Sequence, residues 1–286
     1  MKKIVIISTL TILSSAVFAR ENFIELGAGY MGVKDNLTFI NDKKVINLNN
    51  PPIKQSIYIP VFALEYNGFF IGAGNNSGSI GYRYDFDYAS VEMGIGSYKV
   101  FKDPYLSLEK VNSSQIGLSI SSTIYEMMEL SLGYKNIDVK DKVFKADTKQ
   151  SGDQIDFDAE AILFEFNQEF YAGLGYHFTY HHSQGKSNSY LKNGVSIFNI
   201  FQFEQDYELI FEAMYSSYKF DSKNSHFNKI RDEEGFSIVT NLKVDNIFNS
   251  KDFFLQTNLF YNEVNSNINF FNKEYIGSNF SIGYKF

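Results

Sequence analysis

The chain has 286 residues, a length that suits one or two domains. It contains no cysteine, which excludes disulfides, cysteine nucleophiles and thiolate zinc sites. Its formal net charge of −7 argues against nucleic acid as a partner, because nucleic-acid-binding proteins need basic patches. Hydrophobic residues make up 44% of the chain and aromatic residues 17%. That is enough to fold, but too little for a membrane protein built from apolar helices.

The first residues have the pattern of a secretory signal peptide. Two lysines follow the first methionine, an apolar stretch comes next, and Ala19 follows Val17 with one residue between them. The apolar stretch, at about fifteen residues, is too short to span a bilayer comfortably. We therefore expect residues 1–19 to be a signal peptide of a bacterial protein and residues 20–286 to be its exported domain.

The exported domain alternates between apolar and small or polar residues with a period of two, which is the pattern of β-strands. The clearest case is the last segment, where one face is apolar and aromatic and the other is small and polar. A soluble β-sandwich also alternates in this way. The signal peptide and the aromatic final residue, Phe286, favour a transmembrane barrel whose apolar face meets lipid.

The last residues resemble the C-terminal assembly signal of bacterial outer-membrane barrels, which usually ends in phenylalanine. The residues that carry this resemblance are Phe280, Ile282, Tyr284 and Phe286. The resemblance implies the barrel-assembly machinery as a partner and outer-membrane lipid as the surroundings. It also places the protein in the bacterial cell outer membrane, in a Gram-negative envelope.

We count fourteen antiparallel strands, which must close into a barrel because unpaired backbone groups are too costly in hydrocarbon. Short turns would face the periplasm and longer loops the outside. The weakest part of the count is a short pair, Phe69–Asn75 and Ser79–Asp85. If that pair is one irregular element, the number of strands is twelve.

Several stretches across the exported domain resemble an uncharacterised bacterial outer-membrane barrel family, the domain of unknown function 2860. They are Leu26 to Tyr30, Asp35 to Leu37, Lys102 to Tyr105, Gln115 to Leu118 and Leu132 to Asp138. The resemblance implies a barrel in the outer membrane. It brings no activity and no catalytic residues with it.

Charged and polar residues gather on one face of two neighbouring predicted strands, which we assign to the lumen. This predicted cluster consists of Asp156, Asp158, Glu160, His177, Thr179 and His181. A two-residue turn at Gln168–Glu169 would give three directly opposed pairs: Glu160–His177, Asp158–Thr179 and Asp156–His181. Three interpretations stay open: polar packing in a wet lumen, a charge cluster that tunes ion selectivity or responds to pH, and catalysis or metal binding.

The function favoured by the sequence is a porin-like channel for small solutes with a weak cation preference, working without a cofactor, a metal ion or enzymatic activity. A closed barrel that acts through its surface loops, in adhesion or surface structure, is the alternative. The loop Lys34–Gln55 would decide between them, since its apolar residues suit a plug. An outer-membrane hydrolase is the third reading. A lipid-facing catalytic pair of His182 and Ser183 is poor, because neighbouring residues point to opposite faces of a strand.

Overall fold

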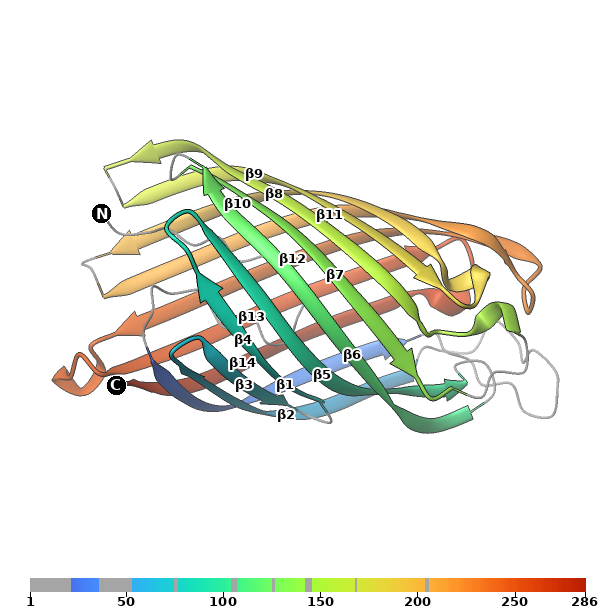
Figure 1. Cartoon of the computed structure of the whole chain (residues 1–286), viewed down its shortest axis with the longest axis horizontal. Coiled ribbons are helices and arrows are strands. Elements are labelled where there is room, and N and C mark those ends of the chain that lie inside the picture. The colour runs from blue at the N-terminus through green and yellow to red at the C-terminus, as the bar shows by residue number, and fades with distance from the viewer. Residues whose placement is uncertain are drawn as a thin grey trace.

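The computed structural model describes residues 22–35, 53–74, 77–103, 107–124, 127–141, 146–167, 169–203 and 206–286. The expected signal peptide, residues 1–19, lies outside these ranges, and so do residues 36–52 of the expected loop Lys34–Gln55. The two ends of that loop belong to strands instead, because β1 extends to Asp35 and β2 begins at Ile53. Fourteen antiparallel strands form a closed barrel in which each strand pairs with the next and β1 pairs with β14 (Figure 1). The count of fourteen is confirmed, and the alternative of twelve is wrong. No helix among the described residues is long and apolar enough to cross a membrane.

The first seven strands are β1 (Phe23–Asp35), β2 (Ile53–Tyr66), β3 (Phe69–Gly74), β4 (Ser77–Asp85), β5 (Ala89–Asp103), β6 (Ser107–Ile124) and β7 (Met128–Val139). The other seven are β8 (Gly152–Phe166), β9 (Phe170–Ser183), β10 (Tyr190–Phe203), β11 (Tyr207–Asn224), β12 (Lys229–Asp245), β13 (Phe253–Ser266) and β14 (Lys273–Lys285). Short 3-10 turns lie between strands: η1 (Ala146–Thr148), η2 (Lys186–Asn188), η3 (Ile247–Asn249) and η4 (Asn269–Phe271).

The two ends of the barrel differ in their connections. The turn between β2 and β3 is the two-residue pair Asn67–Gly68, and both residues have positive φ, 49° and 84°. These angles belong to a hairpin turn that matches the twist of its strands. The C-terminus lies at the same end of the barrel as this turn, since the ring of Phe286 stacks on that of Tyr66 (Figure 1). We assign that end to the periplasm, since the short turns of outer-membrane barrels face it.

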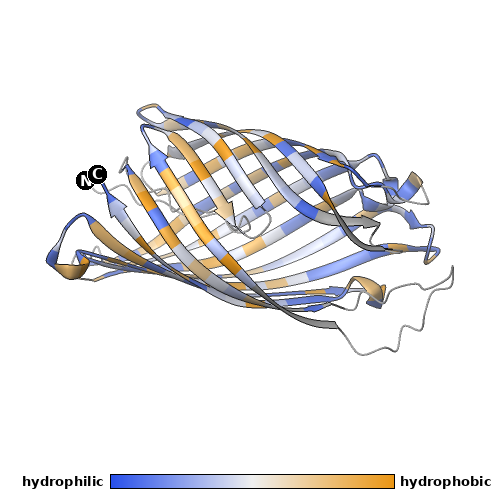
Figure 2. Cartoon of the chain, turned by 90° about the horizontal axis from the view of Figure 1, so that it is seen from below, coloured by the Kyte–Doolittle hydropathy of each residue, from blue (hydrophilic) through white to orange (hydrophobic). Residues whose placement is uncertain are grey.

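The outer surface of the barrel is apolar along most strands. Hydrophobic and hydrophilic residues alternate along each strand, as the bands of colour in Figure 2 show. The large side chains of one parity, such as Ile95, Leu132 and Val195, are more than half exposed. In water such a surface would aggregate, whereas in a bilayer it faces lipid. The inward parity carries glycine, serine and charged residues, as the sequence predicted.

The barrel wall is shorter at β3 and β4 than elsewhere, because these two strands extend less far toward the external end. Strand β3 has only six residues, so β2 pairs with it from Phe62 onward. From Ile53 to Val61, β1 is the only strand among the described residues that pairs with β2. On the far side, β5 pairs with β4 only as far as Ser97. The external part of the wall between β2 and β5 therefore has two strand edges, whose amides need water or polar groups as partners.

The pairing of β8 with β9 differs from the expected register. Phe166 pairs with Phe170, so three residues separate the strands in place of two, and a bulge follows between Ile162 and Phe164. Each change shifts the pairing by one residue. Together they move every partner beyond the bulge by two positions, which leaves the side chains of the predicted cluster on their predicted face.

The external rim on one side of the barrel is tied together by short polar side chains. Ser183 Oγ donates to the Lys149 carbonyl at 2.6 Å, and Ser187 Oγ donates to the Asp147 carbonyl at 2.6 Å. The Asp147 carboxylate in turn accepts bonds from the backbone N–H and the hydroxyl of Ser225. Burial would raise the pKa of Asp147, but the bonds from Ser225 outweigh it and hold the pKa below its usual value. Three external connections are thereby joined into one rim.

Candidate functional site

The barrel encloses a cavity of about 630 Å³. One wall, made by β3 and β5 to β7, presents glycines to it: Gly72, Gly94, Gly96, Gly117 and Gly133. The adjoining wall, made by β8 to β11, carries large and charged side chains and is called the polar wall here. The glycine wall leaves space for the cavity, while Asp158, Glu160 and His177 project from the polar wall.

Acidic side chains outnumber basic ones in the described lining of this cavity. The carboxylates are Glu25, Glu65, Glu92, Glu129, Asp156, Asp158 and Glu160, and the cationic residues are Arg83, Lys135 and Lys192. Two cations are held by acids, since Arg83 contacts Glu65 at 3.0 Å and Lys135 contacts Asp156 at 3.0 Å. These pairs leave the cavity with a surplus of negative charge.

The polar wall has three layers between the periplasmic and the external end. At the periplasmic end lies an apolar floor made of Ile162, Tyr171, Phe198, Ile200 and Ile210. Above it lies an acid–histidine cluster made of Asp158, Glu160, His177, Ser196 and Glu212. At the external end lies an aromatic cap made of His181, Tyr190, Tyr218, Phe220, Arg231 and Phe271. Chemistry that depends on charge is concentrated in the middle layer.

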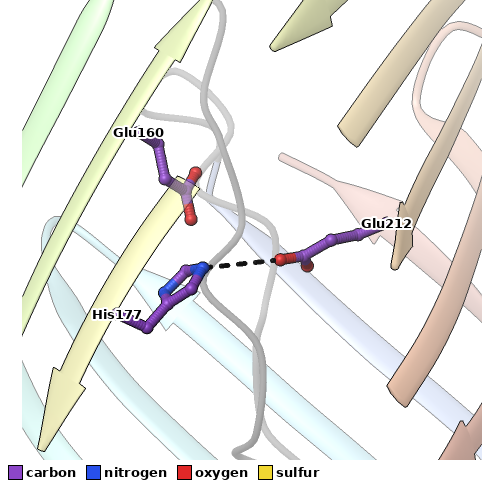
Figure 3. Close-up of side chains that lie close together, drawn as sticks. All are labelled: Glu160, His177 and Glu212. Carbon is purple, nitrogen blue, oxygen red and sulfur yellow. Dashed lines mark ion pairs between the residues drawn. The ribbon is translucent and has the colours of Figure 1, made fainter. Parts of the chain in front are cut away.

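His177 is the centre of the acid–histidine cluster. Its Nδ1 lies 2.8 Å from Asp158 Oδ1, and its Nε2 lies 2.9 Å from Ser196 Oγ and 3.8 Å from Glu212 Oε1. The carboxylate of Glu160 points toward the same ring from β8 (Figure 3). The cluster thus joins side chains from four consecutive strands, β8 to β11.

Position 175, which faces the cluster from β9, is occupied by glycine, and a larger residue there would displace the side chains of the cluster. A Cβ atom there would overlap Ser196 Oγ and come within 2.9 Å of His177 Nε2. The missing side chain lets the histidine ring and the serine hydroxyl meet. It also leaves room for Glu160, whose Cγ would lie 3.3 Å from that Cβ.

Asp158, His177 and Ser196 are linked in the same order as the acid, base and nucleophile of a serine hydrolase. Two further features of such an enzyme are needed: an accessible serine and donors for an oxyanion. Ser196 is only 3% exposed. Its strand is paired on both sides, so the neighbouring N–H groups are used in the sheet and offer no oxyanion hole. Two glutamates beside the histidine would also oppose a negative intermediate. The environment suits a cation better than an oxyanion.

The structure brings part of the predicted cluster together. His177 pairs with Asp158 and not with Glu160, while Thr179 pairs with Asp156 and donates to it at 2.9 Å. His181 is opposite Gln154 and not Asp156, because of the bulge and the longer turn. The three expected pairs are therefore wrong, although all six residues face inward.

His181 belongs to the aromatic cap. Its ring is 5.3 Å from the ring of Tyr190, and the side chain is buried. The sequence reading missed Ser196 and Glu212 because it compared only two neighbouring strands. The available signal was the inward parity of Glu212, which it shares with Ile210 and Met214 on β11.

Arg231 organises the aromatic cap. Its guanidinium lies 3.6 Å from the ring centre of Phe220 and 4.1 Å from that of Phe271. Its Nε lies 3.4 Å from Glu233 Oε1. A planar guanidinium between two rings stacks on both, which the ammonium group of lysine does not do.

We expect Arg231→Ala to lower the free energy of unfolding by about 2 kcal/mol or more, because two desolvated cation–π contacts are lost. Arg231→Lys should recover only part of this loss. Urea titrations of the folded barrel, followed by circular dichroism, measure both values. Lys223→Ala, an exposed lysine on β11, is the matched control and should change stability by less than about 0.5 kcal/mol. Equal effects of Arg231→Ala and Lys223→Ala would contradict the assignment.

The residues expected to form the assembly signal share the outward face of β14. Phe280, Ile282 and Tyr284 are exposed on the barrel surface, and the ring of Phe286 stacks on those of Tyr66 and Tyr284. They extend the apolar belt to the periplasmic edge. Recognition by the assembly machinery stays a prediction.

Solved outer-membrane barrels share this fold. A bacterial polysaccharide outer-membrane secretin matches with a TM-score of 0.53 and 8% identity, over 92% of this chain and 98% of that chain. An outer-membrane channel from Pseudomonas putida F1 matches with a TM-score of 0.50 and 10% identity, over 97% and 100%. In-vitro folded OmpT, an outer-membrane protein of Vibrio cholerae, matches with a TM-score of 0.44 and 10% identity, over 93% and 97%.

At these identities the likeness shows the fold alone. The closed barrel with its apolar outer surface places the protein in the bacterial outer membrane. No curated protein matches the sequence. A family model described as "Protein of unknown function (DUF2860)" matches residues 21–285, which is nearly the whole described barrel. The chain therefore belongs to the DUF2860 family.

Proposed function

We propose that this barrel is a channel that lets small polar solutes cross the outer membrane, with a preference for cations. The observation that carries the proposal is the polar cavity of about 630 Å³ inside a closed barrel, lined by more carboxylates than cationic groups. A low-dielectric wall focuses the field of such groups and concentrates counter-ions. We propose no enzymatic activity, since Ser196, the residue in the position of a nucleophile, is buried and lies close to glutamates.

Reversal potentials in planar bilayers test the channel and its selectivity. The refolded protein, residues 20–286, should give steady channel openings. Reversal potentials in a salt gradient should show that potassium permeates more readily than chloride. One unit charge about 8 Å from an ion in water changes the ion's free energy by about 0.5 kcal/mol, or roughly twofold in permeability. Glu92→Gln with Glu129→Gln should therefore reduce the cation preference, and Lys135→Gln should increase it.

Glu234→Gln is the matched control, because Glu234 is exposed on the outward face of β12, one residue from the inward Glu233. It should leave the permeability ratio unchanged. Bilayers that stay silent, with folding confirmed by gel mobility, would reject the channel and favour a closed barrel that acts through its loops. Anion-selective openings would reject the cation preference alone.

The apolar floor is the observation that favours the closed alternative. Phe198 and Ile200 are almost completely buried at the periplasmic end of the polar wall. A solute must therefore pass along the glycine wall rather than through the floor. The solutes we propose are accordingly ions and small polar molecules rather than sugars or peptides of several units.

A further inference from the structure

We propose that Glu160, His177 and Glu212 form a binding site for one divalent transition-metal ion, for which Zn²⁺ is the natural probe. The site lies in the middle layer of the polar wall and goes beyond the proposed channel. From the sequence alone, metal binding was only the third interpretation of the predicted cluster, which did not include Glu212.

The three side chains bring one ligand atom each to a common point. The ligand atoms lie within 4.8 Å of one another, on three buried residues. Zinc ligands lie about 2.0–2.2 Å from the ion, which places tetrahedral neighbours about 3.4 Å apart. Small rotations of the two glutamate side chains close this difference without any movement of the strands. Figure 3 shows both carboxylates turned toward the imidazole ring.

The environment of Glu160 is an independent observation that favours a bound cation. Its side chain is 4% exposed, and neither carboxylate oxygen has a hydrogen-bond partner. A buried carboxylate without a partner is costly, whereas a cation between Glu160 and Glu212 compensates both charges. Its orientation into the cluster is therefore what a metal ligand requires.

His177 is held in the orientation that a metal ligand needs. Its Nδ1 is engaged by Asp158 Oδ1 at 2.8 Å, which leaves Nε2 as the nitrogen that can bind an ion. Nε2 lies 2.9 Å from Ser196 Oγ and points toward Glu212. A carboxylate behind a ligating histidine is the usual outer-shell arrangement of metal sites, where it fixes the ring.

The donor set selects the class of metal. Calcium takes six to eight oxygen ligands, more than this cluster provides, while imidazole suits zinc, copper, iron and nickel. Two carboxylates neutralise a divalent charge. Glu160 and His177 also line the cavity, so an ion can reach the site from the lumen.

The test uses the folded full-length barrel in detergent, stripped with EDTA and titrated with ZnCl₂ by calorimetry and with CoCl₂ by visible absorption. We expect one equivalent of Zn²⁺ and the d–d bands of a low-symmetry Co²⁺ site, with no binding of Ca²⁺. Asp158→Asn should weaken Zn²⁺ binding by roughly 10- to 100-fold, as outer-shell changes do. Glu160→Gln and Glu212→Gln should weaken it further and abolish the Co²⁺ bands.

These glutamine variants keep the side-chain shape and remove a buried charge, so folding is not at risk; gel mobility confirms it. Glu92→Gln, in the same cavity but outside the cluster, is the matched control and should bind as the unchanged protein does. The proposal is overturned if the folded protein binds no Zn²⁺, or if binding survives both Glu160→Gln and Glu212→Gln. Loss of the metal site with ion currents intact would leave the channel proposal standing.

Discussion

Replacing His177 with leucine should lower the free energy of unfolding by about 3–5 kcal/mol in metal-free buffer, as when one partner is removed from a buried charge cluster. The imidazole contacts Asp158 at 2.8 Å, Ser196 at 2.9 Å and Glu212 at 3.8 Å. Leucine fills a similar space but satisfies none of them. The chain has no tryptophan, so urea titrations should follow circular dichroism and gel mobility.

A double variant identifies the cause of this loss. If uncompensated charge is responsible, adding Glu212→Gln to His177→Leu should restore about 1–3 kcal/mol, a coupling typical of groups in contact. His182→Leu is the matched control, since His182 follows on the same strand and is exposed on the other face. Its effect should stay below about 0.5 kcal/mol. If the His177→Leu protein is as stable as the His182→Leu protein, the imidazole of His177 does not compensate the buried carboxylates around it.

The sequence could predict the barrel because a strand that faces lipid on one side and water on the other must alternate. On the last segment, every residue of the face that runs from Ile276 to Phe286 is apolar or aromatic except Ser278, and the structure keeps this face on the outer surface. The same rule placed Asp158, Glu160 and His177 in the lumen. A period of two survives any shift of the register by two residues, and so these faces were safe predictions.

The partners of those side chains could not be predicted, because turns and bulges set them. The bulge between Ile162 and Phe164 leaves no mark in the alternation that distinguishes it from an ordinary irregularity. Glu212 comes to His177 from β11, two strands away from β9, and its distance depends on the curvature of the barrel. Sequence reading can therefore name the inward residues, while the contacts that make a site need the closed structure.

The apolar floor likewise depends on that closure. Ile162, Tyr171, Phe198, Ile200 and Ile210 have inward parity, which alone would suggest a lumen lined by scattered apolar groups. In the structure they pack against one another on four adjacent strands and fill the periplasmic end of the polar wall. Phe198 lies across Gly173, where a side chain would overlap its ring. The position of a large side chain such as Phe198 against a glycine such as Gly173 thus determines which part of the lumen is filled.

Phe198→Ala should therefore change both stability and conduction. The ring is 3% exposed, and its removal should cost about 3–5 kcal/mol of unfolding free energy, as for other buried aromatic residues. Glu212 is the direct partner of Phe198 on β11, so the space that opens joins the acid–histidine cluster to the periplasmic end. We expect a larger single-channel conductance and a stronger cation preference than in the unchanged protein.

Ile197→Ala separates this effect from a general loss of stability. Ile197 is the neighbour of Phe198 on β10, and its side chain is exposed on the lipid face. It should destabilise the barrel less and leave the conductance unchanged, because no atom is removed from the lumen. Unchanged conductance in Phe198→Ala would mean that ions pass only along the glycine wall. A silent parent protein that conducts once Phe198 is removed would instead identify the floor as the element that keeps the barrel closed.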